Sequence, residues 1–292
     1  MEGGHKIFLG YWNIRGVGER VRLLLEYLEL PYEDHRYVIG AQPNLWFTQD
    51  KPKVQEKNPA ANLPYIRDGE RVIAESDAIC VYLCHKAKKP ELLGRNAEEQ
   101  VDMATVMGVF KDFHKSTVPL FFSKDYEKDL ANFKVSALQR FDKFKGLLGE
   151  KDYMVGRLTW VDFVLAEYLQ GMTLLMPDVI YNYPTLIAYI ERFWAFPEFQ
   201  DYFKSDRWDE HSIIPHFCAW KPTTHVTLGY WSIRGLGERL RHLMEYLKIP
   251  YHQVIYDDAK SDPWFKGAKP ALAKKEPLIN LPYLHDKDNI IS

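Results

Sequence analysis

Cysteine is scarce in this sequence, which holds three residues of that type among 292, at Cys80, Cys84 and Cys218. None belongs to a Cys-x-x-Cys pair, and the ten histidines form no cluster with ligand spacing. A disulfide scaffold and a metal site are therefore not expected. Cys80 and Cys84 fall on one face of a helical-looking segment. We expect the cysteines to pack in cores as small apolar side chains.

An excess of one charge is also missing, because 38 Lys and Arg residues face 40 Asp and Glu residues. A nucleic-acid partner would require a clear basic surplus. No apolar run approaches the roughly 18 residues that cross a bilayer, and the polar start from Met1 to Lys6 shows no secretory signal. The sequence predicts a soluble, cytoplasmic protein with no nucleic-acid or membrane partner, whose 46% hydrophobic content suffices for packed cores.

The most conspicuous feature present is an internal duplication. Residues 10–32 read GYWNIRGVGERVRLLLEYLELPY, and residues 229–251 read GYWSIRGLGERLRHLMEYLKIPY, with 16 of 23 aligned positions identical. The Trp46-Phe47 pair has a counterpart in Trp264-Phe265, and the segment from Asn62 recurs from Asn280, with a Trp-to-Asn spacing of 16 in both copies. A period close to 219 residues indicates a duplicated domain rather than a solenoid.

The second copy is incomplete. It ends at Ser292, the counterpart of Ala74, and so has no match for Glu75-Ser76-Asp77 or the helix after them. A short polar stretch with a proline, residues 221–224, separates the two units. Three explanations stay open: a fragment of a tandem fusion, two adjacent gene copies joined in one gene model, or a working third domain. The first two are favoured.

The first unit has a mixed α/β pattern. Residues 6–10 and 32–39 read as strands, and residues 18–30 have apolar side chains at helical spacing before Pro31. Two short apolar runs, 64–66 and 72–74, flank the hairpin turn signal Asp68-Gly69. Ser76 can cap a helix that continues to Lys86. The order predicts a βαβ half followed by a ββα half, with helices on a small mixed sheet.

From residue 96 to 203 the pattern becomes helical throughout. Apolar stripes recur over residues 103–113 and 130–148. Thr159 and Asp162 form a capping-box-like start before the apolar run 163–175.

These motifs together resemble the cytosolic glutathione transferases, most closely the mu class. The likeness is in the opening G-Y-W-x-I-R-G, the N-L-P-Y segment, the start Glu75-Ser76-Asp77 and the capping box, and it covers residues 5–221. It implies a thioredoxin-like α/β domain at 1–88, an all-helical domain at 96–221 and a truncated thioredoxin-like copy at 225–292. We call this last unit the repeat.

The resemblance implies that Tyr11 is catalytic. A thiol such as that of glutathione has a pKa near 8.5, so little of it is thiolate at neutral pH. A tyrosine hydroxyl, whose own pKa is near 10, stays protonated and can donate a hydrogen bond that stabilises the thiolate. Tyr11 is expected just past the end of the first strand, where ligands of α/β sheets bind.

The other residues implied by the resemblance divide into two groups. Leu63 before Pro64, a cis-proline in the family, would pair with the cysteinyl part of glutathione, Ser76 and Glu75 would hold the γ-glutamyl part, and Trp46 and Lys51 the glycyl carboxylate. Asp112 is either an acid that reaches the partner's site or a solvated helix charge. The implied glutathione-site residues are Trp12, Arg15, Trp46, Lys51, Asn62, Leu63, Pro64, Glu75, Ser76 and Asp112, and the implied electrophile-pocket residues are Trp12, Val17, Phe122 and Trp208.

Three departures from the mu class stand out. Glu75 replaces Gln, the segment from Tyr32 to Trp46 is shorter, and Ala60 stands where an aromatic residue inserts into the dimer partner. A homodimer is still implied, with an altered contact.

The expected activity is transfer of glutathione, as co-substrate and without another cofactor, to hydrophobic electrophiles. A non-catalytic ligandin-like carrier and a glutathione-dependent isomerase or peroxidase remain alternatives. Tyr230 repeats the motif of Tyr11, but the repeat is expected to be inactive because it has neither the Glu-Ser pair nor a helical domain of its own.

Overall fold

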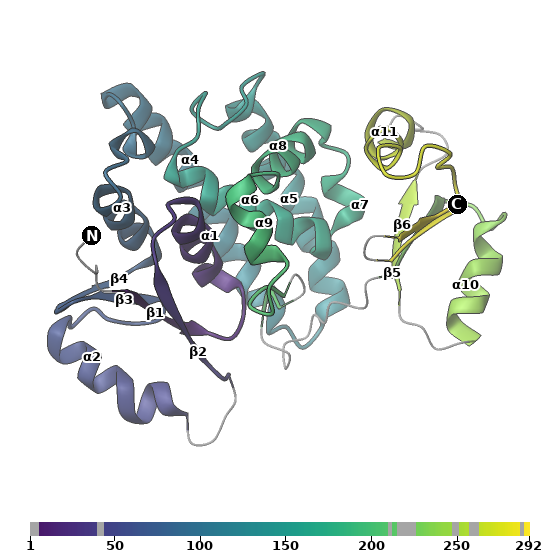
Figure 1. Cartoon of the computed structure of the whole chain (residues 1–292). Coiled ribbons are helices and arrows are strands. Elements are labelled where there is room, and N and C mark those ends of the chain that lie inside the picture. The colour runs from purple at the N-terminus through teal and green to yellow at the C-terminus, as the bar shows by residue number, and fades with distance from the viewer. Residues whose placement is uncertain are drawn as a thin grey trace.

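The computed structural model describes residues 6–39, 44–209, 212–214, 226–246, 251–256, 263–286 and 289–292. Cys218 and the predicted boundary at 221–224 lie outside these residues. The first unit forms a mixed α/β domain (Figure 1). Its elements are β1 (Ile7–Trp12), a 3₁₀ turn (Gly16–Gly18), α1 (Glu19–Tyr27), β2 (Tyr32–Tyr37), a π-helical turn (Trp46–Asp50), α2 (Lys51–Lys57), β3 (Tyr65–Asp68), β4 (Arg71–Ala74) and α3 (Ser76–Lys86).

The four strands form one sheet in the order β2-β1-β3-β4. β1 pairs with β2 in parallel and with β3 antiparallel, and β3 and β4 make the expected hairpin. Helices α1 and α3 lie on one face of this sheet and α2 on the other (Figure 1). The predicted thioredoxin-like order is therefore confirmed.

Four local predictions need correction. β1 continues to Trp12, so Tyr11 lies within the strand and not beyond its end. The strand predicted to reach Ile39 ends at Tyr37, and the helix predicted to reach Leu30 ends at Tyr27. Ser76 is the first residue of α3, whereas the N-cap is Glu75, with a φ of 68° and no side-chain cap bond.

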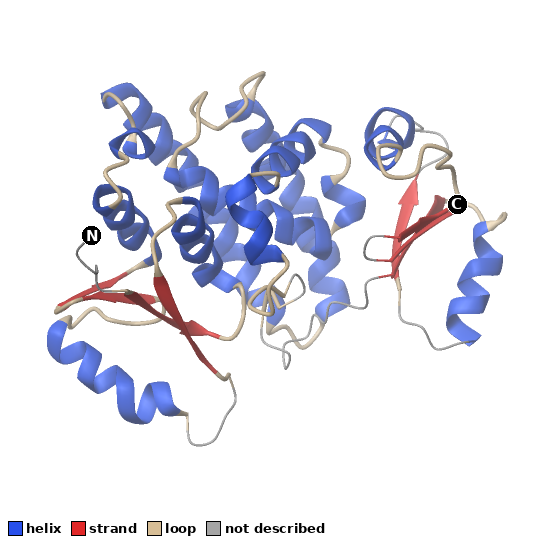
Figure 2. Ribbon diagram, in the orientation of Figure 1, coloured by secondary structure: helices blue, strands red, loops and turns tan. Residues whose placement is uncertain are grey.

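The middle of the chain is all-helical (Figure 2). It comprises a 3₁₀ turn (Pro90–Leu93), α4 (Ala97–Phe121), α5 (Tyr126–Leu148), α6 (Trp160–Leu175), α7 (Pro177–Ile180), α8 (Pro184–Trp194) and α9 (Pro197–Phe203). The capping box is present, since the Thr159 N–H donates to Asp162 Oδ2 at 2.8 Å. One hydrophobic core runs through both domains, because α1 packs on α3 as well as on α6 and α9.

The repeat reproduces the first sheet. It contains β5 (Val226–Trp231), α10 (Gly237–Tyr246), β6 (His252–Tyr256), a π-helical turn (Pro263–Ala268), α11 (Lys269–Leu272), β7 (Tyr283–Asp286) and β8 (Asn289–Ile291). The strand order β6-β5-β7-β8 matches that of the first unit, position for position.

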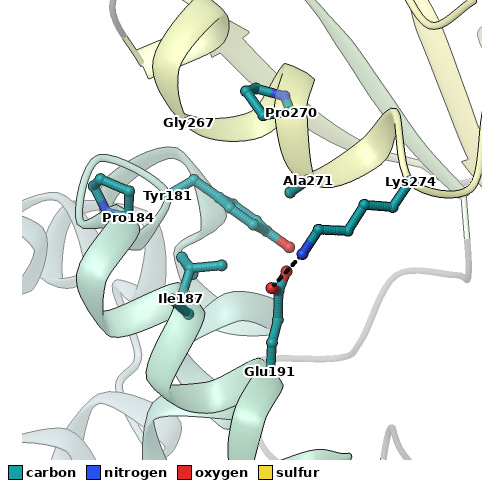
Figure 3. A pocket seen from close by; sticks show the side chains of 9 residues that line it. Tyr181, Pro184, Ile187, Glu191, Gly267, Pro270, Ala271 and Lys274 are labelled. Carbon is teal, nitrogen blue, oxygen red and sulfur yellow. Dashed lines mark ion pairs between the residues drawn. The ribbon is translucent and has the colours of Figure 1, made fainter. Parts of the chain in front are cut away.

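The repeat contacts the helical domain through β6, which packs against α7, and through its π-helical turn and α11. Lys274 Nζ lies 3.5 Å from Glu191 Oε2 of α8. The two sides enclose a cavity of about 130 Å³ beside Tyr181, Ile187 and Pro270 (Figure 3). The repeat therefore uses a different face from the one by which the first unit joins the helices.

That difference leaves α10 without the cover that α1 has. Leu24 of α1 is fully buried, whereas its counterpart Leu243 is 49% exposed. Tyr27 packs edge-on against Phe163 and Phe196, whereas its counterpart Tyr246 is 83% exposed. Helix α10 therefore presents apolar side chains to solvent. Within the described part of the chain, no helix is both long and apolar enough to span a membrane.

Candidate active site

The phenol of Tyr11 sits in a tight enclosure at the start of α1. Its side chain is 5% exposed, and its oxygen accepts a hydrogen bond of 3.1 Å from the Val17 N–H. A Cβ at Gly18 would overlap the tyrosine ring, and one at Gly16, where φ is +40°, would lie 2.6 Å from the hydroxyl. Only glycine permits this approach at both positions.

The enclosure fixes the protonation state of Tyr11. Burial raises its pKa above the usual 10, although the Val17 N–H and the nearby Arg20 and Arg22 oppose that effect. The phenol therefore keeps its proton at neutral pH. Because the Val17 N–H occupies an acceptor site of the oxygen, the hydroxyl hydrogen is left to donate.

Leu63 lies at the same end of the sheet as Tyr11. The Leu63–Pro64 peptide is cis, and Tyr65 begins β3 opposite Gly10 in β1. Neither backbone polar group of Leu63 bonds to a described residue. A free N–H and C=O at this place can pair with an extended peptide, as an added strand would.

Trp46 is fully buried, between the rings of Tyr37 and Tyr65, at centroid distances of 5.4 and 5.5 Å. Its indole Nε1 has no hydrogen-bond partner. Buried donors are nearly always paired, and this one is paired with no described residue. Lys51 is the first residue of α2, and its Nζ lies 5.7 Å from the centre of the Phe47 ring.

Four other predicted glutathione contacts lie at or near the surface. Asn62 and Glu75 are exposed, and Ser76 is half-buried at the N-terminus of α3. Asp112 is exposed on α4. An anion at the α3 N-terminus would meet unpaired backbone N–H groups and the positive end of the helix dipole.

The predicted electrophile-pocket residues come from four segments of the chain. Trp12, at the end of β1, packs beside Phe47, with ring centroids 5.9 Å apart. Val17 is half-buried next to Tyr11, and Phe122, at the C-cap of α4, is 59% exposed. Trp208 lies over the guanidinium of Arg15 at 4.8 Å. It thus packs within the domain junction and covers Arg15.

Arg15 is buried and anchors the turn between β1 and α1 to the helical domain. Its Nη2 lies 3.1 Å from Glu167 Oε1 of α6, and both side chains are almost fully buried. Its N–H donates to the Ser212 carbonyl at 2.6 Å, and the Gly16 N–H donates to the Ile213 carbonyl at 3.0 Å. Arg15 therefore positions the turn between β1 and α1.

Sequence reasoning did not identify Glu167. The signal was its acidic side chain inside the apolar run 163–175. Burial raises the pKa of Glu167, whereas the charges of Arg15 and Arg20 lower it.

The repeat contains a copy of part of this site. The Tyr230 oxygen accepts from the Leu236 N–H at 2.9 Å, and the Leu281–Pro282 peptide is cis. Trp264 is fully buried and its Nε1 has no partner. The described residues of the repeat include no counterpart of Ser76. Among all described residues no group of His, Cys, Asp and Glu is arranged to hold a metal ion.

Family models match all three units. The glutathione S-transferase N-terminal domain matches residues 8–85 and 226–292, and the glutathione S-transferase C-terminal domain matches residues 111–206. Glutathione S-transferase Mu 1 of Rattus norvegicus is 31% identical over 218 residues, which is 73% of this chain and 98% of that protein. Glutathione S-transferase B of Cavia porcellus is 32% identical over 216 residues, covering 73% and 97% of the two chains.

Solved structures of glutathione S-transferases and related enzymes have a similar fold. The glutathione S-transferase of Ascaris lumbricoides superposes with a TM-score of 0.58 at 28% identity, covering 68% of this chain and 96% of that one. Prostaglandin synthase D of Nilaparvata lugens superposes with a TM-score of 0.59 at 25% identity, covering 69% and 98%.

Proposed function

The chain belongs to the glutathione S-transferase family, and from that premise we propose that it joins the thiolate of glutathione to hydrophobic electrophiles with the help of the Tyr11 hydroxyl. Glutathione is the co-substrate, and no other cofactor takes part. The thiolate sulfur attacks the electrophilic carbon, the new C–S bond forms, and a leaving group such as chloride departs with its electron pair. The thiol proton passes to solvent before the attack.

The hydrogen bond between Val17 and Tyr11 is the observation that carries this proposal. It directs the phenolic proton outward, and burial keeps that proton in place at neutral pH. Lowering the thiol pKa by two units takes about 2.7 kcal/mol. One hydrogen bond to a charged acceptor contributes roughly 1.5–3 kcal/mol, so a single phenol is sufficient in magnitude.

The rest of the glutathione molecule would extend in both directions from its thiol at Tyr11. The free backbone groups of Leu63, supported by Asn62 and Pro64, hold the cysteinyl part. The unpaired Trp46 indole and the Lys51 ammonium take the glycyl carboxylate, and Glu75 and Ser76 take the γ-glutamyl end. Asp112, exposed on α4, would reach the site of the partner in a homodimer.

The electrophile would bind against Trp12, Val17 and Phe122. This wall is apolar and aromatic, so it suits hydrophobic compounds and discriminates weakly among them. Trp208 would act through Arg15 and not by direct contact. We propose that the domains at 1–88 and 96–221 carry out this reaction in the cytoplasm. The repeat, residues 225–292, takes no part in turnover.

Turnover of 1-chloro-2,4-dinitrobenzene tests the proposal. The full chain should form the conjugate, and Tyr11→Phe should lower kcat/KM at neutral pH by about 10- to 100-fold. Tyr230→Phe, the matched change in the repeat, should leave the rate unchanged. If the protein binds glutathione but its rate equals that of Tyr11→Phe, the transferase assignment fails in favour of a ligandin-like carrier.

An isomerase is the second candidate, because a prostaglandin synthase is among the similar structures. Such an enzyme, like a glutathione-dependent peroxidase, would use the same tyrosine. Assays of prostaglandin H2 isomerisation and of hydroperoxide reduction beside the conjugation assay would separate the three.

A further inference from the structure

Arg20, the second residue of α1, is a buried cation without a partner. Its side chain is 3% exposed, and no hydrogen bond or ion pair joins it to any described residue. Its Nε is enclosed and has no partner among the described residues. The neighbouring arginines differ: Arg15 pairs with Glu167 at 3.1 Å, and Arg22 pairs with Asp34 at 3.0 Å. A buried guanidinium with five free donors costs stability unless something accepts from it.

Two carboxylates among the described residues lie near Arg20, and each already pairs with another cation. Glu167 is committed to Arg15, and Asp77 of α3 pairs with Lys111 at 2.9 Å. His114, on the facing helix α4, is uncharged at neutral pH, since burial and the charge of Arg20 lower its pKa to about 4. Both carboxylates are thus already paired with another cation, and neither is left for the positive charge of Arg20.

The position of Arg20 connects it to the proposed electrophile wall. Its guanidinium lies 4.9 Å from the ring centre of Phe110 on α4. His114, Val118 and Phe122 follow Phe110 at intervals of four residues, so the four side chains form one slanted ridge of the helix. The ridge begins at buried Phe110 and ends at the exposed side chains of Val118 and Phe122. Arg20 thus lies at the buried end of the ridge that the electrophile would contact.

Tyr11 is also close to the start of α1, because its ring lies against Gly18, two residues before Arg20. The charge of Arg20 acts on the phenol and lowers its pKa against the effect of burial, as does the charge of Arg22. A ligand that reached from the Tyr11 hydroxyl along the α4 ridge would therefore pass beside the free guanidinium.

We propose that Arg20 binds the carboxylate of the second substrate, and so directs this enzyme toward electrophiles that are apolar acids. The planar guanidinium matches a carboxylate with two parallel N–H···O bonds. The apolar body of the substrate packs along the ridge from Phe110 toward Val118, and its reactive carbon faces the thiolate at Tyr11. This inference rests on the proposed function and specifies its substrate class.

A matched pair of substrates tests the inference. 4-Chloro-3-nitrobenzoate and its methyl ester share one reactive carbon and differ in the negative charge. In the full chain, Arg20→Met should lower kcat/KM for the acid by at least about tenfold, and the ester should change by no more than about twofold. Arg20→Lys should retain part of the activity on the acid. Arg239→Met, which removes the exposed counterpart in the repeat, should change neither rate.

The outcomes separate the explanations. An equal loss on acid and ester, accompanied by a lower unfolding temperature, would show that Arg20 is only structural and would overturn the inference, as would no loss at all. If the wild type converts neither compound, the transferase proposal fails by itself. Calorimetric binding of unreactive 3-nitrobenzoate and its methyl ester, with glutathione present, then tests Arg20 alone. The acid should bind at least about tenfold more weakly to Arg20→Met, and equal binding would reject the role of Arg20.

Discussion

The N–H of Val17 donates to the hydroxyl of Tyr11 at 3.1 Å, across the turn that joins β1 to α1. This bond and the two glycines beside it hold one phenol in one orientation. The same contact recurs between Leu236 and Tyr230 at 2.9 Å. The two copies therefore share the local geometry of the tyrosine, and what differs between them is its surroundings.

Substitution of Gly18 should displace the phenol. In Gly18→Ala the new methyl group overlaps the Tyr11 ring, so we expect kcat/KM to fall at least about tenfold and the protein to lose about 1–3 kcal/mol of stability. Gly237→Ala makes the same overlap with Tyr230 and should leave kcat/KM unchanged. Steady-state kinetics of both variants would check this. Normal kinetics in Gly18→Ala would mean that the position of the ring does not matter.

The buried indole of Trp46 gives a prediction about glutathione affinity. Trp46→Phe keeps an aromatic ring but removes the unpaired N–H. The KM for glutathione should rise about tenfold, as expected for one lost bond to a carboxylate, with kcat nearly constant. Trp264→Phe removes the equivalent N–H in the repeat and serves as the control. Equal effects of the two changes would argue against a role of Trp46 in binding.

The ion pair between Arg15 and Glu167 should be important for stability. Arg15→Met leaves Glu167 buried and unpaired, and breaking such a pair typically costs about 3–5 kcal/mol. The counterpart of Arg15 in the repeat, Arg234, is exposed, so Arg234→Met should change the free energy of unfolding by less than about 0.5 kcal/mol. Urea unfolding of the two variants measures the difference. A small loss in Arg15→Met would show that Glu167 finds another partner or takes up a proton.

His114 predicts a specific dependence of stability on pH. Burial and Arg20 lower its pKa to about 4, while Asp77 acts in the opposite direction. The unfolded chain binds the proton near pH 6.5, so the unfolded state takes up a proton that the folded state refuses. The stability supplied by neutral His114 is complete above pH 6.5 and is lost as the pH falls to about 4. Unfolding curves of His114→Gln should vary less over this interval, and curves parallel to wild type would contradict the assignment.

Motifs with local causes could be predicted from the sequence. The order of a βαβ half and a ββα half, the helical domain and the capping box at Thr159 follow from apolar periodicity and end signals. The copy at residues 225–292 follows from direct repetition. The chemistry of Tyr11, Leu63 and Trp46 came with the family resemblance, and the structure adds their burial and their unpaired polar atoms.

Contacts between distant segments could not be predicted. Glu167 lies 152 residues from Arg15, and no local pattern links the two. Trp208 packs on Arg15, a contact that no local pattern predicts, because the position of a side chain near the C-terminal segment depends on how two domains meet. The exposure of Leu243 and Tyr246 likewise depends on which face of the repeat touches the helices.

The ionisation of bound glutathione tests the central claim most directly. The ultraviolet absorbance of the thiolate, titrated on the glutathione complex, gives the thiol pKa inside the site. In the wild type and in Tyr230→Phe we expect a pKa about two units below the usual value near 8.5, and in Tyr11→Phe a return to about that usual value. A thiol pKa that stays low in Tyr11→Phe, with glutathione still bound, would contradict the role given to the Tyr11 hydroxyl.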